Sequence, residues 1–236
     1  MKSLLLAAAI IISQTTLSAD LDSFFSKTDS FLKKYVSKGE VAYKKIKINK
    51  IDIESLYNEI SGTKVGGESE NVLKAFYTNA YNILVIHSIV EKYPVKSPMD
   101  IQGFFDQKKH NVAGEQLTLN ELEKNKLLNP YKDARFHFVL VCAAKSCPPL
   151  SSDAFTPAKI DSQLQERTSL TINDEDWLKV NPSTRKIELS KIFEWYQGDF
   201  TSEGKSVIDW INKYRNEKIS TSNTISYYEY DWSLNE

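Results

Sequence analysis

The stretch "NVLKAFYTNAYNILVIHSIVEKY", Asn71 to Tyr93, decides the fold of this chain. Wound as a helix, it carries apolar residues over most of its circumference, which predicts a helix at the centre of the core. Pro94 follows directly and ends the predicted helix, because proline supplies no N–H for the helical ladder. Asn79 and Asn82 share one side of this apolar surface. A buried asparagine needs hydrogen bonds, so we expect both to bond to the loop that carries Cys147, as structural contacts or as part of a site.

Shorter helices and strands are predicted on both sides of the central helix. The helical segments span residues 20–36, 51–60, 160–170, 190–197 and 205–214. Strands are predicted in a hairpin around Ala113 and Gly114, in two alternating runs around the turn "NPS", and in "ISYYEYDW". The segment "TLNELEKNKLL" predicts a helix that begins with a capping box of Asn120 and Glu123. These elements predict one α+β domain over residues 20–236, with a small, largely antiparallel sheet wrapped by helices.

The composition is that of an ordinary globular protein. Of the 236 residues, 30 are basic and 31 are acidic, so the net charge is −1. This balance gives no electrostatic reason to expect nucleic acid as a partner. The sequence has no phosphate-binding loop and no dinucleotide fingerprint, so we predict no cofactor and expect a peptide or small molecule as the partner.

The first nineteen residues have the order of a secretory signal peptide. Lys2 precedes an apolar run from Leu4 to Ile12, and small and polar residues then lead to Ala19. The apolar run is shorter than the ~20 residues that cross a bilayer, so we predict no membrane span. We expect cleavage next to Ala19 and a mature protein that is periplasmic or secreted.

A second stretch, "RFHFVLVCAAKSCPPL" at Arg135–Leu150, holds both cysteines and one of the three histidines. Its apolar run predicts a strand over residues 136–141 that is buried on both faces. In a regular strand His137 and Cys142 point to opposite faces, whereas Cys147 lies beyond a turn and can fold back toward either face. Pro149 suits the first position of a helix, which would place Cys147 at a helix N-terminus that favours a thiolate.

One interpretation of this stretch is a nucleophile with its base. A thiolate of Cys147, with His137 as proton acceptor, meets the requirements of a Cys–His pair. A third group usually orients the imidazole, and we expect Asn79 in this role. Backbone N–H groups of "AAKSC" are candidates for an oxyanion hole. The candidate binding residues are Asn82, Arg135, Lys145 and Ser146.

Two other interpretations remain open. A Cys142–Cys147 disulfide would close a short loop and fix the turn between the cysteines. Zinc held by these cysteines and His137 is compatible with the ligand types, but the spacing is at the edge of the usual range and no fourth ligand lies nearby. We therefore predict no metal. We interpret His87 as a core histidine, and His110 as a solvated surface residue because lysines precede it.

Five segments together resemble the DUF547 family, which is defined by sequence and has no assigned activity. The segments are "AFYTNAYNILVIHSIVEKYPVKSPMDI" at Ala75–Ile101, "VAGEQLTLNELE" at Val112–Glu123, "RFHFVLVCAAKSCPPL" at Arg135–Leu150, "LSKIFEWYQGDF" at Leu189–Phe200 and "YDWSLN" at Tyr230–Asn235. The resemblance implies an exported bacterial member of the family. Its characteristic positions would be Asn79, Asn82, His87, His137, Cys142, Ser146, Cys147 and Pro148. This chain departs from the family at Ala143, where glycine is frequent, and at Lys124, where histidine is frequent.

These observations support three functional hypotheses. The leading hypothesis is a thiol-dependent hydrolase or acyl transferase that acts on a peptide or amide bond, with Cys147 as nucleophile. The competing hypothesis is a non-catalytic envelope binding module, with a disulfide between Cys142 and Cys147 as a staple. The third is a structural zinc domain.

The signal-peptide pattern yields a direct prediction. The mature protein should begin at Ala19 or Asp20 and should be recovered outside the cytoplasm, because the segment before these residues has the order that signal peptidase removes. Intact-mass measurement of protein from the cell envelope and the medium checks this. Recovery there of a species that still carries Met1 would contradict the prediction.

Overall fold

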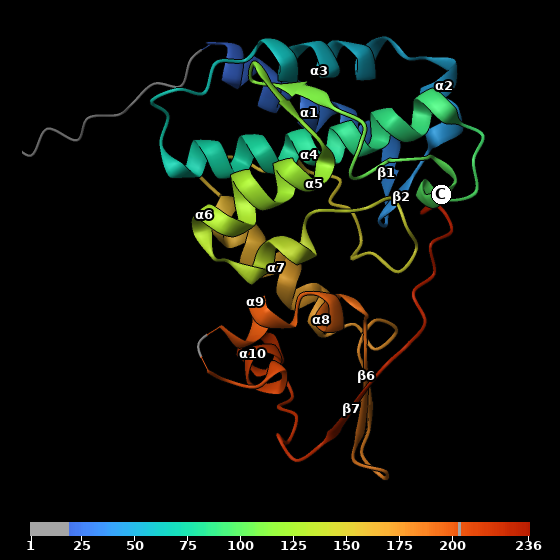
Figure 1. Ribbon diagram of the computed structural model, residues 1–236, viewed down its shortest axis with the longest axis vertical. Coiled ribbons are helices and arrows are strands. Elements are labelled where there is room, and N and C mark those ends of the chain that lie inside the picture. The colour runs from blue at the N-terminus through green and yellow to red at the C-terminus, as the bar shows by residue number, and fades with distance from the viewer. Residues whose placement is uncertain (1–18, 203) are drawn as a thin grey trace, which may run out of the picture.

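The computed structural model describes residues 19–202 and 204–236, which form a single-domain α+β fold with small sheets of two or three strands (Figure 1). This confirms the predicted fold class. The predicted signal segment lies outside the described residues, apart from its last position. Among the described helices, none is long and apolar enough to cross a membrane.

Helices predominate in the N-terminal part of the fold. The elements, in chain order, are α1 (Ala19–Tyr35), β1 (Val36–Ser37), β2 (Glu40–Val41), α2 (Tyr43–Ile48), α3 (Ile51–Gly62), α4 (Glu70–Lys92), η1 (Pro98–Asp100), β3 (His110–Val112), β4 (Glu115–Leu117), α5 (Leu119–Leu122), η2 (Glu123–Leu128), α6 (Asn129–Tyr131) and η3 (Ala134–Phe138). The C-terminal part contains α7 (Ile160–Ile172), β5 (Lys179–Asn181), β6 (Lys186–Leu189), α8 (Ile192–Trp195), α9 (Gln197–Thr201), α10 (Val207–Tyr214) and β7 (Thr224–Tyr227).

Helix α4 forms the centre of the larger hydrophobic core, as its sequence predicts. Every side chain from Ala75 to Val90 is buried, so no face of this part of the helix meets solvent. Helices α1, α2 and α3 pack on one side of α4, and α5, η2 and α7 contact it elsewhere (Figure 1). We call this cluster the main core; Phe76 and Ile83 lie within it.

A second hydrophobic cluster lies at the other end of the molecule. We call it the second core, and it includes Phe138, Phe193 and Trp210. The rings of Phe138 and Trp210 stack with centroids 5.5 Å apart and planes 13° apart. Around this core, β6 pairs antiparallel with β5 and parallel with β7, because α8, α9 and α10 intervene before the chain returns. From β7 the chain runs back to the main core, where the C-terminus lies beside β1 and β2 (Figure 1).

The hairpin and its following helix form close to the predicted positions. Strands β3 and β4 pair around Ala113 and Gly114, which both have positive φ, as the tight turn requires. The capping box of α5 uses Thr118 and Glu121, two residues before the predicted pair. Thr118 is the N-cap residue because its side chain accepts a hydrogen bond from the Glu121 N–H, while the Glu121 carboxylate accepts one from the Thr118 N–H.

The strand predicted over residues 136–141 is wrong. This segment begins as the 3-10 helix η3, and Asp133 caps it by accepting a hydrogen bond from the Arg135 N–H. The apolar pattern has another cause: Phe136 packs in the main core, whereas Phe138 packs in the second core. A short helical turn between two cores buries side chains on both faces, as a central strand would.

The helix predicted to begin at Pro149 is also wrong. The next helix, α7, starts at Ile160, so Cys147 does not lie at a helix N-terminus. Residues 151–153 form a turn, in which the Ser151 hydroxyl accepts a hydrogen bond from the Asp153 N–H. The carbonyl of Pro149 instead accepts a hydrogen bond from the guanidinium of Arg167.

His110 is buried, which contradicts its interpretation as a solvated residue. Its exposed fraction is 1%, and the Tyr57 ring lies edge-on to it. Neither ring nitrogen has a hydrogen-bond partner among the described residues. Burial, aided by the charges of Lys108 and His87, lowers the pKa of His110 from 6.5 to about 4.

This buried histidine predicts a specific loss of stability in acid. Between pH 6.5 and about 4 the unfolded chain binds a proton at His110 that the folded protein does not. The free energy of unfolding should therefore fall by about 3 kcal/mol across this window through this residue alone. His110→Phe keeps an aromatic ring and removes the titration.

Urea unfolding at several pH values, on both proteins, provides the measurement. The difference in unfolding free energy between variant and wild type should shift by about 3 kcal/mol in favour of the variant as the pH falls from 7 to 4. Other titrating groups occur in both proteins and cancel in this comparison. A constant difference would show that His110 titrates normally.

Candidate functional site

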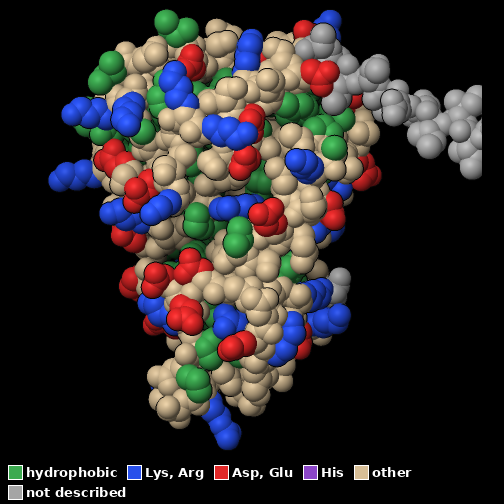
Figure 2. Space-filling model, turned by 180° about the vertical axis from the view of Figure 1, so that it is seen from behind, with side chains coloured by type: hydrophobic (Ala, Val, Ile, Leu, Met, Phe, Trp, Pro, Cys, Tyr) green, Lys and Arg blue, Asp and Glu red, His purple; other side chains and the backbone are tan. Residues whose placement is uncertain are grey.

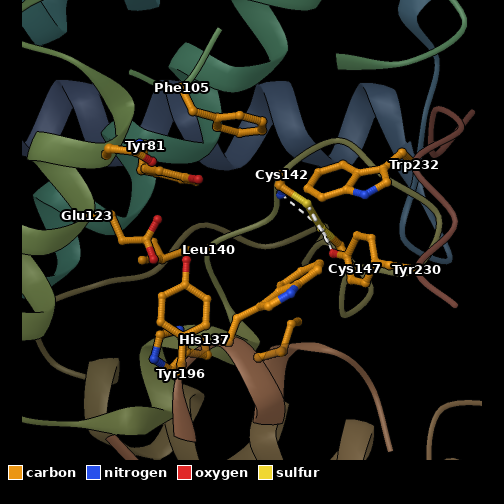
Figure 3. A pocket seen from close by; sticks show the side chains of 13 residues that line it. Tyr81, Phe105, Glu123, His137, Leu140, Cys142, Cys147, Tyr196, Tyr230 and Trp232 are labelled. Atoms are coloured by element: carbon orange, nitrogen blue, oxygen red, sulfur yellow. Dashed lines mark hydrogen bonds between the residues drawn. A yellow bond between two sulfur atoms is a disulfide. The ribbon is translucent and has the colours of Figure 1, made fainter. Parts of the chain in front are cut away.

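A pocket of about 270 Å³ lies between the main core and the second core (Figure 3). Both cores contribute to it: Tyr81 and Leu140 come from the main core, and Ile192 from the second. Tyr196 and Tyr230 pack against both. The residues that line it are Tyr81, Phe105, Asn120, Glu123, His137, Leu140, Cys142, Cys147, Ile192, Trp195, Tyr196, Tyr230 and Trp232.

Asn82 fixes the segment that forms one wall of the pocket. Its side-chain amide donates to the Val139 carbonyl at 2.9 Å, and its side-chain oxygen accepts from the Val141 N–H at 3.0 Å. The carboxamide therefore pairs with the backbone as a neighbouring strand would. This contact explains why an asparagine lies inside an apolar helix, because it supplies partners to two buried backbone groups.

Asn79 plays the same structural role one turn earlier. It donates to the Phe155 carbonyl at 2.7 Å and accepts from the Phe155 N–H at 3.0 Å. Its second amide hydrogen goes to the Ala75 carbonyl of its own helix. Asn79 therefore does not orient the His137 ring, and the role expected for it is wrong. The two asparagines together hold both ends of the loop that carries Cys142 and Cys147.

The two cysteines form a disulfide in the pocket wall, with Cα atoms 6.4 Å apart (Figure 3). The Tyr230 hydroxyl lies 3.2 Å from the Cys142 sulfur and 3.1 Å from the Cys147 sulfur. Burial raises the pKa of this tyrosine, so its hydroxyl stays protonated and can donate to either sulfur. In this oxidised state neither sulfur is a free thiol.

Residues 231–235 run along the disulfide loop and fix its shape. The N–H groups of Lys145 and Ser146 donate to the carbonyls of Ser233 and Asp231, and Ala144 forms a β-bridge with Leu234. These contacts require a positive φ of 65° at Ala143. A non-glycine residue there costs roughly 1–2 kcal/mol, which gives a physical reason for the glycine that is frequent in the resembling family.

His137 pairs with a carboxylate and not with a cysteine. Its Nε2 lies 2.8 Å from Oδ2 of Asp199, and its ring packs against that of Tyr196 with centroids 4.1 Å apart and planes tilted by 38°. The hydrogen bond with His137 lowers the pKa of Asp199. Figure 3 shows His137 beside Tyr196, across the pocket from the disulfide. The predicted pair of Cys147 with His137 is not formed in this state.

Glu123 is a buried carboxyl group in the pocket wall. It begins the π-helical segment η2, a kind of distortion that is frequent at functional sites. Its exposed fraction is 7%, and burial raises its pKa, although His137 and a hydrogen bond from Tyr196 act in the opposite direction. The ion pairs of the described residues do not include Glu123.

The remaining predicted site residues do not line this pocket. Arg135 forms ion pairs with Asp133 and Asp161 on another face, where these contacts raise its pKa. Ser146 and Lys145 act through the loop contacts described above, and the Ser146 hydroxyl accepts from the Asp231 N–H. Asn82 lies behind the wall and positions it. Of the predicted site residues, the structure brings only Cys142, Cys147 and His137 to the pocket.

His87 is buried, as predicted, on the far side of α4. It stacks on Tyr57 with centroids 4.2 Å apart, and its Nε2 lies 3.4 Å from a carboxylate oxygen of Glu54. Burial lowers its pKa. Within residues 19–202 and 204–236 there is no group of three or more histidine, cysteine or acidic side chains that could hold a metal ion, so the zinc hypothesis lacks a ligand set there.

Sequence reasoning missed most of the residues that give the pocket its character. On sequence, Glu123 belongs only to a helix cap and Tyr196 only to a predicted helix, and Asp199 follows the end of that helix without a role. The available signal was the resemblance itself, because its segments at 112–123, 189–200 and 230–235 contain these residues. The missed residues are Tyr81, Phe105, Glu123, Trp195, Tyr196, Asp199, Tyr230 and Trp232.

The asparagine contacts predict a measurable cost. Asn82→Ala should lower the free energy of unfolding by roughly 2–4 kcal/mol, because two buried backbone groups lose their partner. Asn79→Ala should cost roughly 1–3 kcal/mol for the same reason. Asn58→Ala, at an exposed position of α3, is the matched control and should leave stability nearly unchanged. Denaturant unfolding of the three variants checks this; equal midpoints for Asn58→Ala and Asn82→Ala would contradict it.

Comparison with known proteins identifies a family but no characterised relative. No curated protein and no solved structure matches the chain. A family model described as "Protein of unknown function, DUF547" matches residues 67–170. The matched region runs from the loop before α4 to the last turn of α7, and it contains both asparagines, the disulfide, Glu123 and His137. Residues 67–170 are therefore similar to the DUF547 family, whose description gives no function.

Proposed function

We propose that this domain binds a peptide or a small molecule by enclosing one side-chain-sized or ring-sized group in the central pocket. The observation that carries the proposal is the lining of the pocket, in which six of thirteen residues are tyrosine, tryptophan or phenylalanine. Aromatic rings supply large, rigid contact area, and pockets with this lining are typical ligand sites. The signal-peptide pattern of the first nineteen residues supports a site of action in the periplasm or outside the cell.

The size of the pocket limits what it can hold. Its volume of about 270 Å³ lies just below the ~300–1,000 Å³ of sites that enclose whole drug-sized ligands. A larger ligand would therefore insert one group and leave the rest outside. Trp195 is 48% exposed at the pocket and can contact the part that remains outside.

The disulfide supports a binding role because it makes the wall rigid. Cys142 and Cys147 close the loop, and the Cys142 N–H donates to the Cys147 sulfur at 3.0 Å. The Tyr230 hydroxyl contacts both sulfurs, so the cross-link also orients one of the aromatic rings. A preformed wall lowers the entropy lost when a ligand binds.

A thiol-dependent hydrolase or acyl transferase is the second candidate. One observation favours it: both cysteines and His137 line the same pocket. This activity needs the disulfide to be reduced and the side chains to approach, since His137 now pairs with Asp199. The binding role needs neither change, so we favour it.

The first test measures binding with defined probes. N-acetyl amino-acid amides with aromatic, aliphatic, cationic and anionic side chains are titrated into the oxidised protein and followed by calorimetry. At least one class should bind saturably, and Trp195→Ala should weaken it about tenfold, since an aromatic contact contributes about 1–1.5 kcal/mol. Leu170→Ala removes an exposed apolar side chain elsewhere and should change nothing. Absence of saturable binding for every class would refute the proposal.

The second test separates the two candidates through thiol reactivity. Without reductant, iodoacetamide should label neither Cys142 nor Cys147 in the native protein, because both sulfurs are bonded. After reduction, the hydrolase candidate requires Cys147 to react readily near pH 6, which is well below the pKa of ~8.5 of a free thiol. It also requires that this reactivity is lost in His137→Ala. Peptide mapping of the labelled sites gives the result. An ordinary pKa in both proteins would remove the hydrolase candidate.

A further inference from the structure

We infer that the group this pocket accepts is an alkylammonium cation, held between the carboxyl group of Glu123 and the faces of the surrounding aromatic rings. The inference rests on the binding role proposed above and names its ligand class. It follows from the combination of rings, carboxyl group and charge in one enclosed space.

The aromatic residues surround the pocket on several sides. Trp195, Tyr230 and Trp232 form one continuous wall, with ring centroids 4.7–5.9 Å apart. Phe105 extends this wall, with its ring 6.3 Å from that of Trp232. Figure 3 shows Tyr81 across the cavity from Tyr230 and Trp232. A cation within about 6 Å of such ring faces is attracted by their negative charge density, and tryptophan is the strongest partner.

Glu123 supplies the opposite charge at the right place. Figure 3 shows its carboxyl group on the side of the cavity opposite Tyr230 and Trp232, so a bound group would lie between the carboxyl group and these rings. Tyr196 is its hydrogen-bond partner and leaves room for another contact, because a carboxylate accepts several hydrogen bonds. Burial disfavours the charged form of Glu123 in the empty pocket, and a bound cation would offset this cost.

The basic side chains near the pocket are either exposed to solvent or paired with a carboxylate. Among the described lining residues there is no lysine or arginine. Lys124 follows Glu123 in the sequence but is exposed to solvent. His137 is the one basic side chain in the wall, and Asp199 pairs with its ring. On the face of the molecule seen in Figure 2, acidic and basic side chains are interspersed.

The test compares ligands of equal shape that differ in charge. Choline and 3,3-dimethylbutan-1-ol form one pair, in which carbon replaces the cationic nitrogen. The peptides Gly-Lys-Gly and Gly-norleucine-Gly form a second pair. Calorimetry at pH 7 with the oxidised protein should give a dissociation constant at least about tenfold lower for the cation in one pair or both, because the faces of desolvated aromatic rings attract a cation and not its neutral counterpart. The pair that shows the difference tells whether a free quaternary amine or a peptide amine is preferred.

Two variants connect this preference to the named residues. Glu123→Gln keeps the shape of the side chain and should weaken binding of the cation about tenfold or more while sparing the neutral partner. Glu229→Gln removes a charge from an exposed neighbour of Tyr230 and is the matched control. Trp195→Leu keeps an apolar side chain at an exposed position, so this variant should fold and can test the inference even where Glu123→Gln fails to fold. It should weaken binding of the cation and leave binding of the neutral partner unchanged.

The possible outcomes separate this inference from the function on which it rests. Equal affinity for the charged and neutral members of both pairs, with loss of both in Trp195→Ala, would overturn the cation inference and leave the binding role intact. Cation binding that Glu123→Gln and Trp195→Leu do not change would locate the site elsewhere and overturn the inference as well. No saturable binding of these four probes or of the amino-acid amides would overturn both proposals.

Discussion

The pairing of the Asn82 carboxamide with the backbone at Val139 and Val141 is the contact on which the pocket depends. It joins the rigid central helix to a segment that has no regular partner strand. Cys142 follows Val141 directly, so this contact fixes the position of the disulfide loop relative to α4. The residues that pair with the loop and the Tyr230 hydroxyl are positioned through it. An apolar residue at this position would leave two buried backbone groups without partners. A hydrogen-bonding requirement, and not a catalytic one, accounts for this asparagine.

The sequence predicted well those features that depend on neighbours along the chain. The central helix, the hairpin at Ala113–Gly114 and the hydrogen bonds of the two asparagines follow from local pattern and from the cost of buried polar groups. The strand predicted over residues 136–141 was wrong, because an apolar run is equally expected in a segment that lies between two separate cores. The interpretation of His110 was wrong because neighbouring lysines suggested solvent, whereas α3 and α4 lie against the ring. Periodicity carries no information about such distant neighbours.

The candidate site was predicted only in part for the same reason. Its cysteines and His137 lie close together in sequence and attracted attention by their chemistry. Glu123, Tyr196 and Tyr230 come from three distant segments, and only the fold brings them to one cavity. Their arrangement changes the chemical picture of the site. The sulfurs are bonded and His137 pairs with Asp199, so the reactive groups of the Cys–His hypothesis are occupied, while the aromatic rings and one buried acid remain available to a ligand.

The position of the pocket between two hydrophobic cores has a thermodynamic consequence. The main core and the second core bury separate sets of side chains. Local unfolding of one core is therefore coupled to the other only through the segments that join them. A ligand that touches Tyr81 on one side and Ile192 on the other binds only while both cores are folded. Its binding free energy is therefore lost when either core unfolds, which couples the unfolding of the two cores. The ligand-bound protein should therefore unfold in one cooperative transition, with the ligand acting as a non-covalent cross-link between the two cores.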